Sequence, residues 1–121
     1  MKAKELQIGD YVNYRGQIIK VTSLYDKGGS NEVGWSDKED VWVNADNVKP
    51  IPITEELLEK NGFKGGQFFA ELYIQGWQVM SDAHNLCMKN ECGWDINIQC
   101  GFVHQLQHAL RLCGINKEIE L

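Results

Sequence analysis

The chain has 121 residues, of which 43% are hydrophobic and 24% charged, and this composition is ordinary for a globular protein. Its formal net charge of −5 disfavours a general affinity for nucleic acid, because phosphate binding depends on Lys and Arg. The charged N-terminus lacks the apolar run of an export signal, and no stretch has the apolar length of a membrane span. We therefore expect a cytoplasmic protein with reduced cysteines and no contact with a membrane.

The first part of the chain contains short strand patterns separated by residues that favour turns. We expect strands at residues 11–14, 17–25, 32–35, 40–44 and 49–51, with one helical turn at 45–48. Short strands at this density indicate a closed or nearly closed β-barrel, because closure hides the sheet edges.

Two prolines, Pro50 and Pro52, mark the end of this first unit. Thr54 is a good N-cap for a short helix, and the two glutamates that follow it suit the positive end of the helix dipole. The sequence therefore predicts a β-barrel at residues 1–51, followed at residues 52–121 by a linker helix and a small antiparallel α+β unit.

Strand patterns return at residues 67–75, 77–82 and 85–89, and the clearest alternation lies at residues 92–102. Its apolar positions are Cys92, Trp94, Ile96, Ile98, Cys100 and Phe102. A period of two predicts a strand with one buried face and one solvated face.

A helix is expected over residues 103–113, with an apolar stripe on one side. The stripe consists of Leu106, Ala109, Leu110 and Cys113. His104, His108 and Arg111 fall on roughly the opposite side, where we expect solvent. The tail at residues 115–121 is expected to be either a short strand or a frayed end. Together these elements predict an α+β fold, with the barrel packed against a small antiparallel sheet and a C-terminal helix.

The helix presents a possible metal-binding pair, because His104 and His108 lie four residues apart. The spacing matches the HExxH motif of zinc metalloproteases, in which the Glu acts as general base. Here Gln105 occupies the Glu position, and no third ligand is evident. We therefore interpret the pair as two polar residues on a solvated face. Zinc binding or hydrolysis through His104 and His108 is the alternative.

A second possible metal site consists of His84 with Cys87, Cys92 and Cys100. No Cys-x-x-Cys pair is present, although strong zinc signatures contain such pairs. Cys92, Cys100 and Cys113 fall on apolar faces, which favours packing in the core. Nothing beside Cys87 points to a lowered thiol pKa, as a catalytic Cys–His pair would need. We therefore expect no cofactor.

The expected barrel is rich in aromatic residues, which either fill its core or line a groove for a ligand. They are Tyr11, Tyr14, Tyr25, Trp35 and Trp42. Amphipathic aromatics supply contact area at low entropic cost, so Tyr14, Trp35 and Trp42 are our candidate ligand-binding residues. We expect a site on these aromatics or in the seam between the two units.

The stretch from Glu5 to Val12, with Gly16 and Val21, is similar to the opening of SH3-like and KOW-like barrels. Combined with residues 51–63 and 103–110, it resembles a family of small uncharacterised proteins of Bacteroides-type gut bacteria and their prophages. The resemblance implies an SH3-like barrel, a Pro-x-Thr-Glu-Glu helix, a small sheet and a C-terminal helix that opens with a Val-His-x-Leu-Gln-type motif. It implies a layout and a genomic context, but no activity.

The leading hypothesis is a non-enzymatic module of phage or mobile-element origin that binds an unidentified protein partner. We expect it to be a monomer or a weak homodimer. The alternatives are a zinc protein or hydrolase using His104 and His108, and a nucleic-acid-associated phage protein using the barrel.

Overall fold

The computed structural model describes residues 1–25, 27–35, 42–65 and 68–121. In these residues it contains three antiparallel sheets and two α-helices, which confirms the predicted α+β class. No helix among them combines the length and the apolar character needed to cross a bilayer. Residues 40, 41 and 67, at the starts of two predicted strands, lie outside the described residues.

The contacts within the chain divide it into two compact units, which are described separately below. Unit 1 is Met1–Ile51 and unit 2 is Pro52–Leu121.

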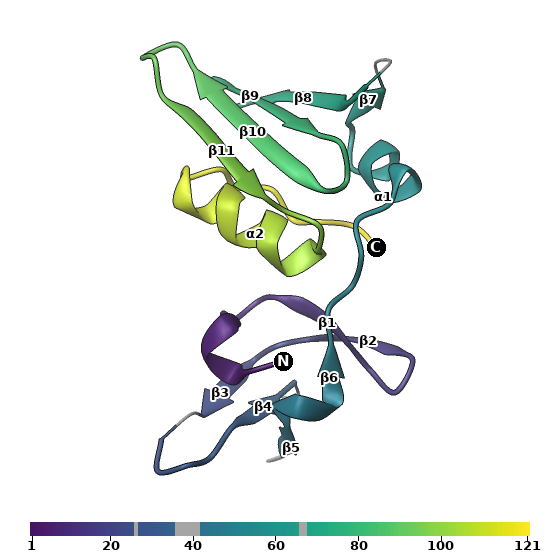
Figure 1. Ribbon diagram of the computed structural model, residues 1–121, viewed down its shortest axis with the longest axis vertical. Coiled ribbons are helices and arrows are strands. Elements are labelled where there is room, and N and C mark those ends of the chain that lie inside the picture. The colour runs from purple at the N-terminus through teal and green to yellow at the C-terminus, as the bar shows by residue number, and fades with distance from the viewer. Residues whose placement is uncertain (26, 36–41, 66–67) are drawn as a thin grey trace. The chain divides into compact units, whose positions relative to one another are not determined.

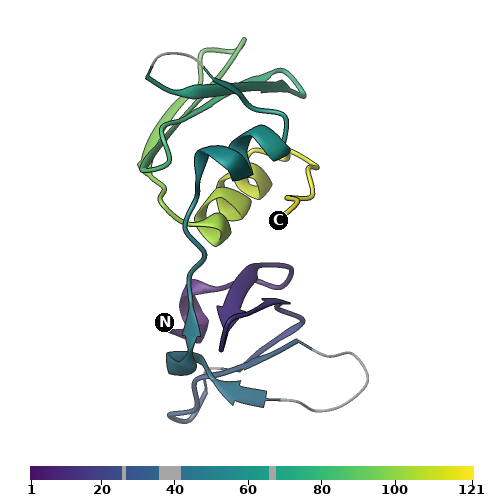
Figure 2. The same cartoon turned by 90° about the vertical axis from the view of Figure 1, so that its right-hand side faces the viewer.

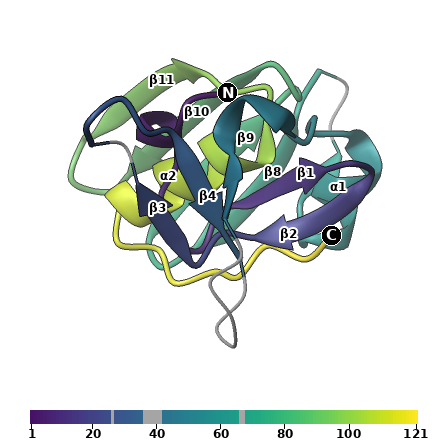
Figure 3. The same ribbon diagram turned by 90° about the horizontal axis from the view of Figure 1, so that it is seen from below.

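Unit 1 is built from short strands and two 3-10 turns. In chain order they are η1 (Ala3–Glu5), β1 (Tyr11–Tyr14), β2 (Gln17–Lys20), β3 (Ser23–Tyr25), β4 (Glu32–Gly34), β5 (Trp42–Asn44), η2 (Ala45–Asn47) and β6 (Val48–Lys49). β1 pairs with β2 and β6, and β4 pairs with β3 and β5, so that two three-stranded antiparallel sheets result (Figure 1). The strands of the two sheets run in different directions (Figure 3).

The segment expected as one strand at residues 17–25 contributes to both sheets, because its backbone changes partner at Val21. Val21 N–H donates to the carbonyl of Asp10, whereas Thr22 N–H donates to the carbonyl of Gly34. β2 therefore pairs with β1, and β3 pairs with β4. The expectation was a closed or nearly closed barrel. The ladders of the described residues form two separate sheets and no closed barrel.

Both sheets of unit 1 nevertheless bury side chains in one shared core. Val12 and Ile19 come from the first sheet and Val33 from the second, and all three are buried. The other buried members are Ala3, Leu6, Val21, Ala45 and Val48. Full burial of a Val or Ile side chain contributes roughly 1.5–3 kcal/mol to folding, so this small cluster is what holds the two sheets together.

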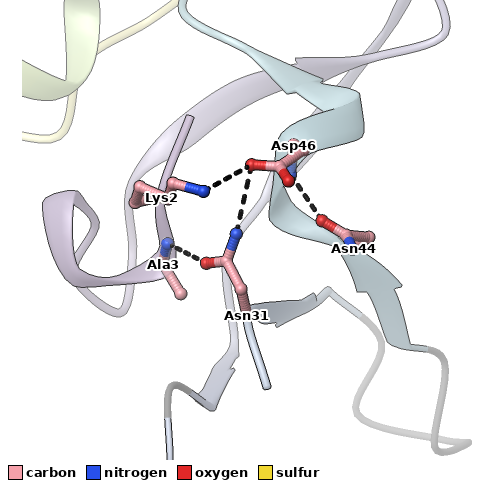
Figure 4. Close-up of polar contacts among 5 residues, drawn as sticks. All are labelled: Lys2, Ala3, Asn31, Asn44 and Asp46. Carbon is pink, nitrogen blue, oxygen red and sulfur yellow. Dashed lines mark hydrogen bonds and ion pairs between the residues drawn. The ribbon is translucent and has the colours of Figure 1, made fainter. Parts of the chain in front are cut away.

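A polar cluster ties the N-terminal segment of unit 1 to η2 (Figure 4). Ala3 N–H donates to Asn31 Oδ1 at 2.6 Å, and the amide nitrogen of Asn31 donates to Asp46 Oδ1 at 3.3 Å. Lys2 Nζ reaches the same carboxylate at 3.2 Å. Asp46 N–H in turn donates to Asn44 Oδ1 at 2.9 Å, which caps η2.

Unit 2 contains a five-stranded antiparallel sheet and both α-helices. Its elements are α1 (Glu55–Lys60), β7 (Lys64–Gly65), β8 (Ala70–Ile74), β9 (Trp77–Ser81), β10 (Asn85–Asn90), β11 (Asp95–Gln99) and α2 (Val103–Leu112). The strand order is β11-β10-β9-β8-β7, so consecutive strands are neighbours throughout. Thr54 Oγ1 accepts a hydrogen bond from Leu57 N–H at 3.2 Å, as expected of an N-cap.

Helix α2 lies along one face of this sheet (Figures 1 and 2). Val79 of β9 pairs with Met88 of β10, Leu86 lies on the same face of β10, and all three are at most 1% exposed. The buried side chains of α2 include Val103, Leu106, Ala109 and Leu110. At the end of the helix, Cys113 Sγ lies 4.0 Å from Met88 Sδ. The apolar stripe predicted for this helix therefore forms the core of unit 2 with the sheet.

The expectation that the alternating segment 92–102 buries its apolar face is wrong for most of its residues. Trp94 is 67% exposed, Ile98 is 40% exposed and Cys92 is also exposed, whereas Cys100 is fully buried. The reason is position, because β11 is an edge strand of the sheet formed by the described residues, and α2 has only 10 residues with which to cover it.

The C-terminal tail is neither a strand nor frayed. The buried side chain of Asn61, at the end of α1, accepts from Glu120 N–H at 2.7 Å and donates to the Glu120 carbonyl at 2.8 Å. Ile115 and Ile119 are buried as well. The tail is therefore fixed to unit 2 by hydrogen bonds and by apolar burial.

Candidate functional site

The face of the unit 2 sheet opposite α2 is open and contains a hollow. Because side chains alternate along a strand, Met80, Cys87 and Asn97 face this side next to one another on β9, β10 and β11. The hollow, here called the open-face hollow, has a volume of about 630 Å³. This size lies within the range of about 300–1,000 Å³ typical of ligand sites.

Two consecutive phenylalanines form the rim of the open-face hollow. Phe68 is 78% exposed and Phe69 is 39% exposed, and both line the hollow just before β8 begins. We call this pair the Phe ridge. A single exposed apolar residue is common on protein surfaces, but adjacent aromatic rings beside a hollow are a typical feature of interaction sites.

A second hollow shares the Phe ridge with the first. It has a volume of about 290 Å³ and is also lined by Leu58, Glu55 and Glu59 of α1, and we call it the α1 hollow. Among the described residues that line either hollow, none is Lys or Arg, whereas Glu55, Glu59 and Asp82 are acidic. The ridge therefore combines exposed aromatic surface with a negative surrounding.

Asp82 belongs to both hollows and is held in its ionised form by the turn between β9 and β10. Its Oδ1 accepts from His84 N–H at 2.9 Å and from Asn85 N–H at 2.6 Å. The hydrogen bond from His84, followed by that from Asn85, lowers the pKa of Asp82 below its ordinary value. A fixed negative charge therefore stands beside the Phe ridge at neutral pH.

The same turn contains a strained backbone at Ala83, which also lines the α1 hollow. Ala83 has φ of 73°, in the left-handed region that disfavours residues with a side chain. Its N–H donates to Ser81 Oγ at 3.1 Å, and this bond and those to Asp82 hold the turn in place. Strain of this kind persists only where surrounding contacts over-determine the conformation.

Cys87 is the thiol in the open-face hollow, and its surroundings keep it protonated. Its Sγ lies 3.6 Å from Asp95 Oδ1, to which the thiol donates. Burial, and secondly the charge of Asp95, raise the pKa of Cys87. Because the thiolate is the reactive form, this arrangement does not activate a nucleophile.

The three aromatic residues predicted as one binding wall form two separate pairs in unit 1. Tyr14 and Trp35 are half-buried against the core with ring centroids 5.2 Å apart, and the Arg15 guanidinium lies 5.3 Å from the Tyr14 ring. Trp42 is 40% exposed and packs edge-on against Tyr25 at 6.5 Å. The sheet register explains the division. Val33 of β4 faces the core, so the next residue, Gly34, faces the other side of the sheet. Trp42 of β5 pairs with Gly34 and therefore faces outward as well.

His104 and His108 do not form the solvated pair expected from the sequence. His104 is buried, with 6% of its surface exposed, and it stacks on the Phe102 ring with 15° between the planes. His108 is half-buried. The buried residues of α2 span a wider arc than its apolar stripe, because they include His104 and Gln107 as well. The expectation of solvent at His104 is therefore wrong.

The two histidine rings do lie close together, with centroids 5.6 Å apart. Within the part of the chain that the structure describes, no group of three or more His, Cys, Asp or Glu residues could hold a metal ion. Gln105, at the position of the HExxH glutamate, uses its Oε1 to accept from the N–H groups of Gly101 and Phe102 at 3.0 and 3.2 Å. It therefore caps the start of α2.

All four cysteines are free, but they differ in burial. Cys100 is buried, and burial raises its pKa to about 12. Burial also raises the pKa of the half-buried Cys113. Cys92 lies exposed in the turn before β11, so the expectation of core packing is correct for Cys100 and wrong for Cys92.

The Phe ridge was not among the site residues predicted from the sequence, because both phenylalanines fall within the strand expected at residues 67–75. A signal was present, because two consecutive large apolar residues cannot both face the same side of a strand. One of the two therefore had to point away from the face that α2 covers.

Comparison of the chain with protein-family models, curated proteins and solved structures found no match.

Proposed function

We propose that this protein is a non-enzymatic interaction module whose Phe ridge binds a partner-protein segment with apolar and basic side chains. The observation that carries the proposal is the 78% exposure of Phe68, which lines both hollows. Aromatic side chains that insert into or beside pockets supply much of the binding energy at protein interfaces.

The charge around the ridge supports the choice of partner. Asp82, Glu55 and Glu59 line the hollows beside the two rings, without a basic residue among the described lining residues. Lys and Arg can interact with the carboxylates and also with the faces of aromatic rings. A segment that alternates apolar and basic side chains would therefore match both properties of this surface.

The polar groups of the open-face hollow favour recognition over chemistry. Its thiol, Cys87, is protonated and bonded to Asp95, and Asp82 is occupied by backbone N–H groups. Asn85, Asn97 and Gln99 add amide groups that can donate to and accept from a peptide backbone. This set provides orientation and specificity, but no general base paired with a nucleophile.

We also propose that unit 1 is an SH3-like module and that the protein is of phage or mobile-element origin. The first proposal is supported by the two small sheets around one core and by the 3-10 turn before β6, and the second by the sequence resemblance alone. A cytoplasmic location is in keeping with four free cysteines.

The Tyr14–Trp35 pair is the second candidate surface for a partner.

The test is selection from a random peptide library against the full chain and against its Phe68→Ser variant. We expect wild-type protein to enrich peptides with Lys or Arg beside aromatic or aliphatic residues, and the variant to lose them. Tyr73→Ser is the matched control, because Tyr73 is a 70% exposed aromatic on β8 that lies outside both hollows. Equal enrichment by the Phe68 variant, or selection of acidic peptides, would rule out the proposal.

A further inference from the structure

Among the residues that the structure describes, no strand pairs with the outer side of β11, which forms one edge of the unit 2 sheet. At its two ends, Asn90 N–H donates to the Trp94 carbonyl and Cys100 N–H donates to the His84 carbonyl. Hydrogen-bonded pairs alternate with non-bonded pairs in an antiparallel ladder, so the even-numbered residues of β11 bond to β10. The N–H and C=O groups of Asp95, Asn97 and Gln99 therefore point away from the sheet.

This edge lacks the features that usually prevent strands from pairing between molecules. Proteins protect such edges with Pro, with Lys, with bulges or with very short strands. The stretch from Trp94 to Cys100 contains no Pro and no basic residue, and its single charge is Asp95. Its apolar side chains are also available, since Trp94 is 67% exposed and Ile98 is 40% exposed.

The sequence of β11 is complementary to itself in the antiparallel direction. When Asn97 is placed opposite Asn97 of a second copy, Asp95 lies opposite Gln99 and Ile96 lies opposite Ile98. The side chain of Asp95 then lies beside that of Gln99, and the two Asn97 side chains lie beside each other. Each of these pairs can form hydrogen bonds, and no two like charges meet. The Ile96–Ile98 pairs lie on the side of the sheet that α2 covers, continuous with the buried Leu86 and Met88.

We propose that two copies of this chain associate through β11, in an antiparallel pair centred on Asn97. The two five-stranded sheets then become one continuous sheet with two-fold symmetry. The contact uses the edge of the sheet, where Asn97 and Gln99 also line the open-face hollow, and it does not involve the Phe ridge itself. A two-fold pair would present two ridges at once, which increases the avidity for a repetitive partner.

The test is the molecular mass of the full chain by analytical ultracentrifugation over a series of concentrations. We expect the wild-type mass to approach twice that of one chain as concentration rises. Asn97→Pro should remain at the mass of one chain, because it removes an outward N–H that β10 does not use. A wild-type mass that stays at one chain throughout, or an Asn97→Pro variant that still doubles, would overturn the proposal.

Two further variants keep the result interpretable if Asn97→Pro fails to fold. Ile98→Lys places a charge opposite Ile96 of the other copy, and we expect it to abolish the doubling. Ile18→Lys is its control, because Ile18 is 50% exposed on the edge strand β2 of unit 1, and it should pair like wild type. If Ile98→Lys still pairs, or if Ile18→Lys alone abolishes pairing, the proposal is wrong.

Amide hydrogen exchange tests the register itself. We expect the N–H groups of Asp95, Asn97 and Gln99 to be protected in concentrated protein and to lose that protection on dilution. Unchanged exchange at these three positions while the mass doubles would place the contact elsewhere and overturn the proposal. Phe68→Ser should leave mass and exchange unchanged, so failure of ridge binding and failure of pairing can be told apart.

Discussion

The left-handed backbone of Ala83 is the clearest point of local strain in unit 2. In this conformation a residue with a side chain destabilises the folded state by roughly 1–2 kcal/mol. Glycine avoids that strain, but the greater conformational entropy of its unfolded chain lowers stability by about 0.4–1 kcal/mol. We therefore predict that Ala83→Gly raises the free energy of unfolding by about 0.5–1 kcal/mol, measured by urea denaturation. Ala70→Gly, within strand β8, is the control and should lower it. Equal destabilisation by both changes would show that Ala83 is unstrained.

The carboxylate of Asp82 makes the stability of the same turn depend on pH. Its pKa is lowered by backbone N–H groups, first that of His84 and then that of Asn85. A lowered folded-state pKa means that the ionised group stabilises the fold above the unfolded pKa, and that this contribution is lost as pH falls through the folded value.

We predict that Asp82→Asn lowers the melting temperature at neutral pH. Because the side chain is exposed, the loss should stay below about 1 kcal/mol. The difference from wild type should shrink as the pH falls below the ordinary Asp pKa of about 3.9. Melting curves at neutral and acidic pH measure it, and a difference that persists in acid would contradict the assignment of the charge.

At the scale of elements, Asn61 joins the end of α1 to the C-terminal tail. Its side chain donates to the carbonyls of Leu57 and Glu120, both at 2.8 Å, and accepts from Glu120 N–H. We predict that Asn61→Ala lowers the free energy of unfolding by about 2–3 kcal/mol, because buried backbone groups lose their partners.

Urea denaturation measures this loss, with Asn116→Ala as the matched control in the same tail. Asn116 is exposed, and its substitution should change the free energy by no more than about 0.5 kcal/mol. If the two variants unfold alike, Asn61 does not hold the tail.

Local signals were sufficient to predict most elements of this fold. The N-cap at Thr54 and the periodicity around Leu106 correctly predicted both α-helices, since caps and apolar stripes are encoded within a few residues. The alternation at residues 92–102 predicted a strand but not its exposure. A period of two shows which residues share a face, whereas the coverage of that face depends on strand order, which local sequence does not encode.

The candidate site was less predictable, because it depends on which elements the fold brings together. Tyr14, Trp35 and Trp42 all lie in unit 1, yet register and sheet identity divide them between two pairs. The Phe ridge gains its surroundings from α1 and from the turn containing Asp82, which are separate elements of unit 2. Such a combination becomes visible only when strand order is known.

For the whole molecule, the central claim is that the partner binds to unit 2 at the Phe ridge. The most direct measurement is an NMR titration of isotope-labelled full chain with a peptide carrying alternating aromatic and basic residues. The account predicts that amide shifts gather at Glu55, Glu59, Phe68, Phe69 and Asp82, and that Phe68→Ser abolishes them. Shifts that gather instead at Tyr14 and Trp35 of unit 1, or shifts that survive in the Phe68 variant, would contradict it.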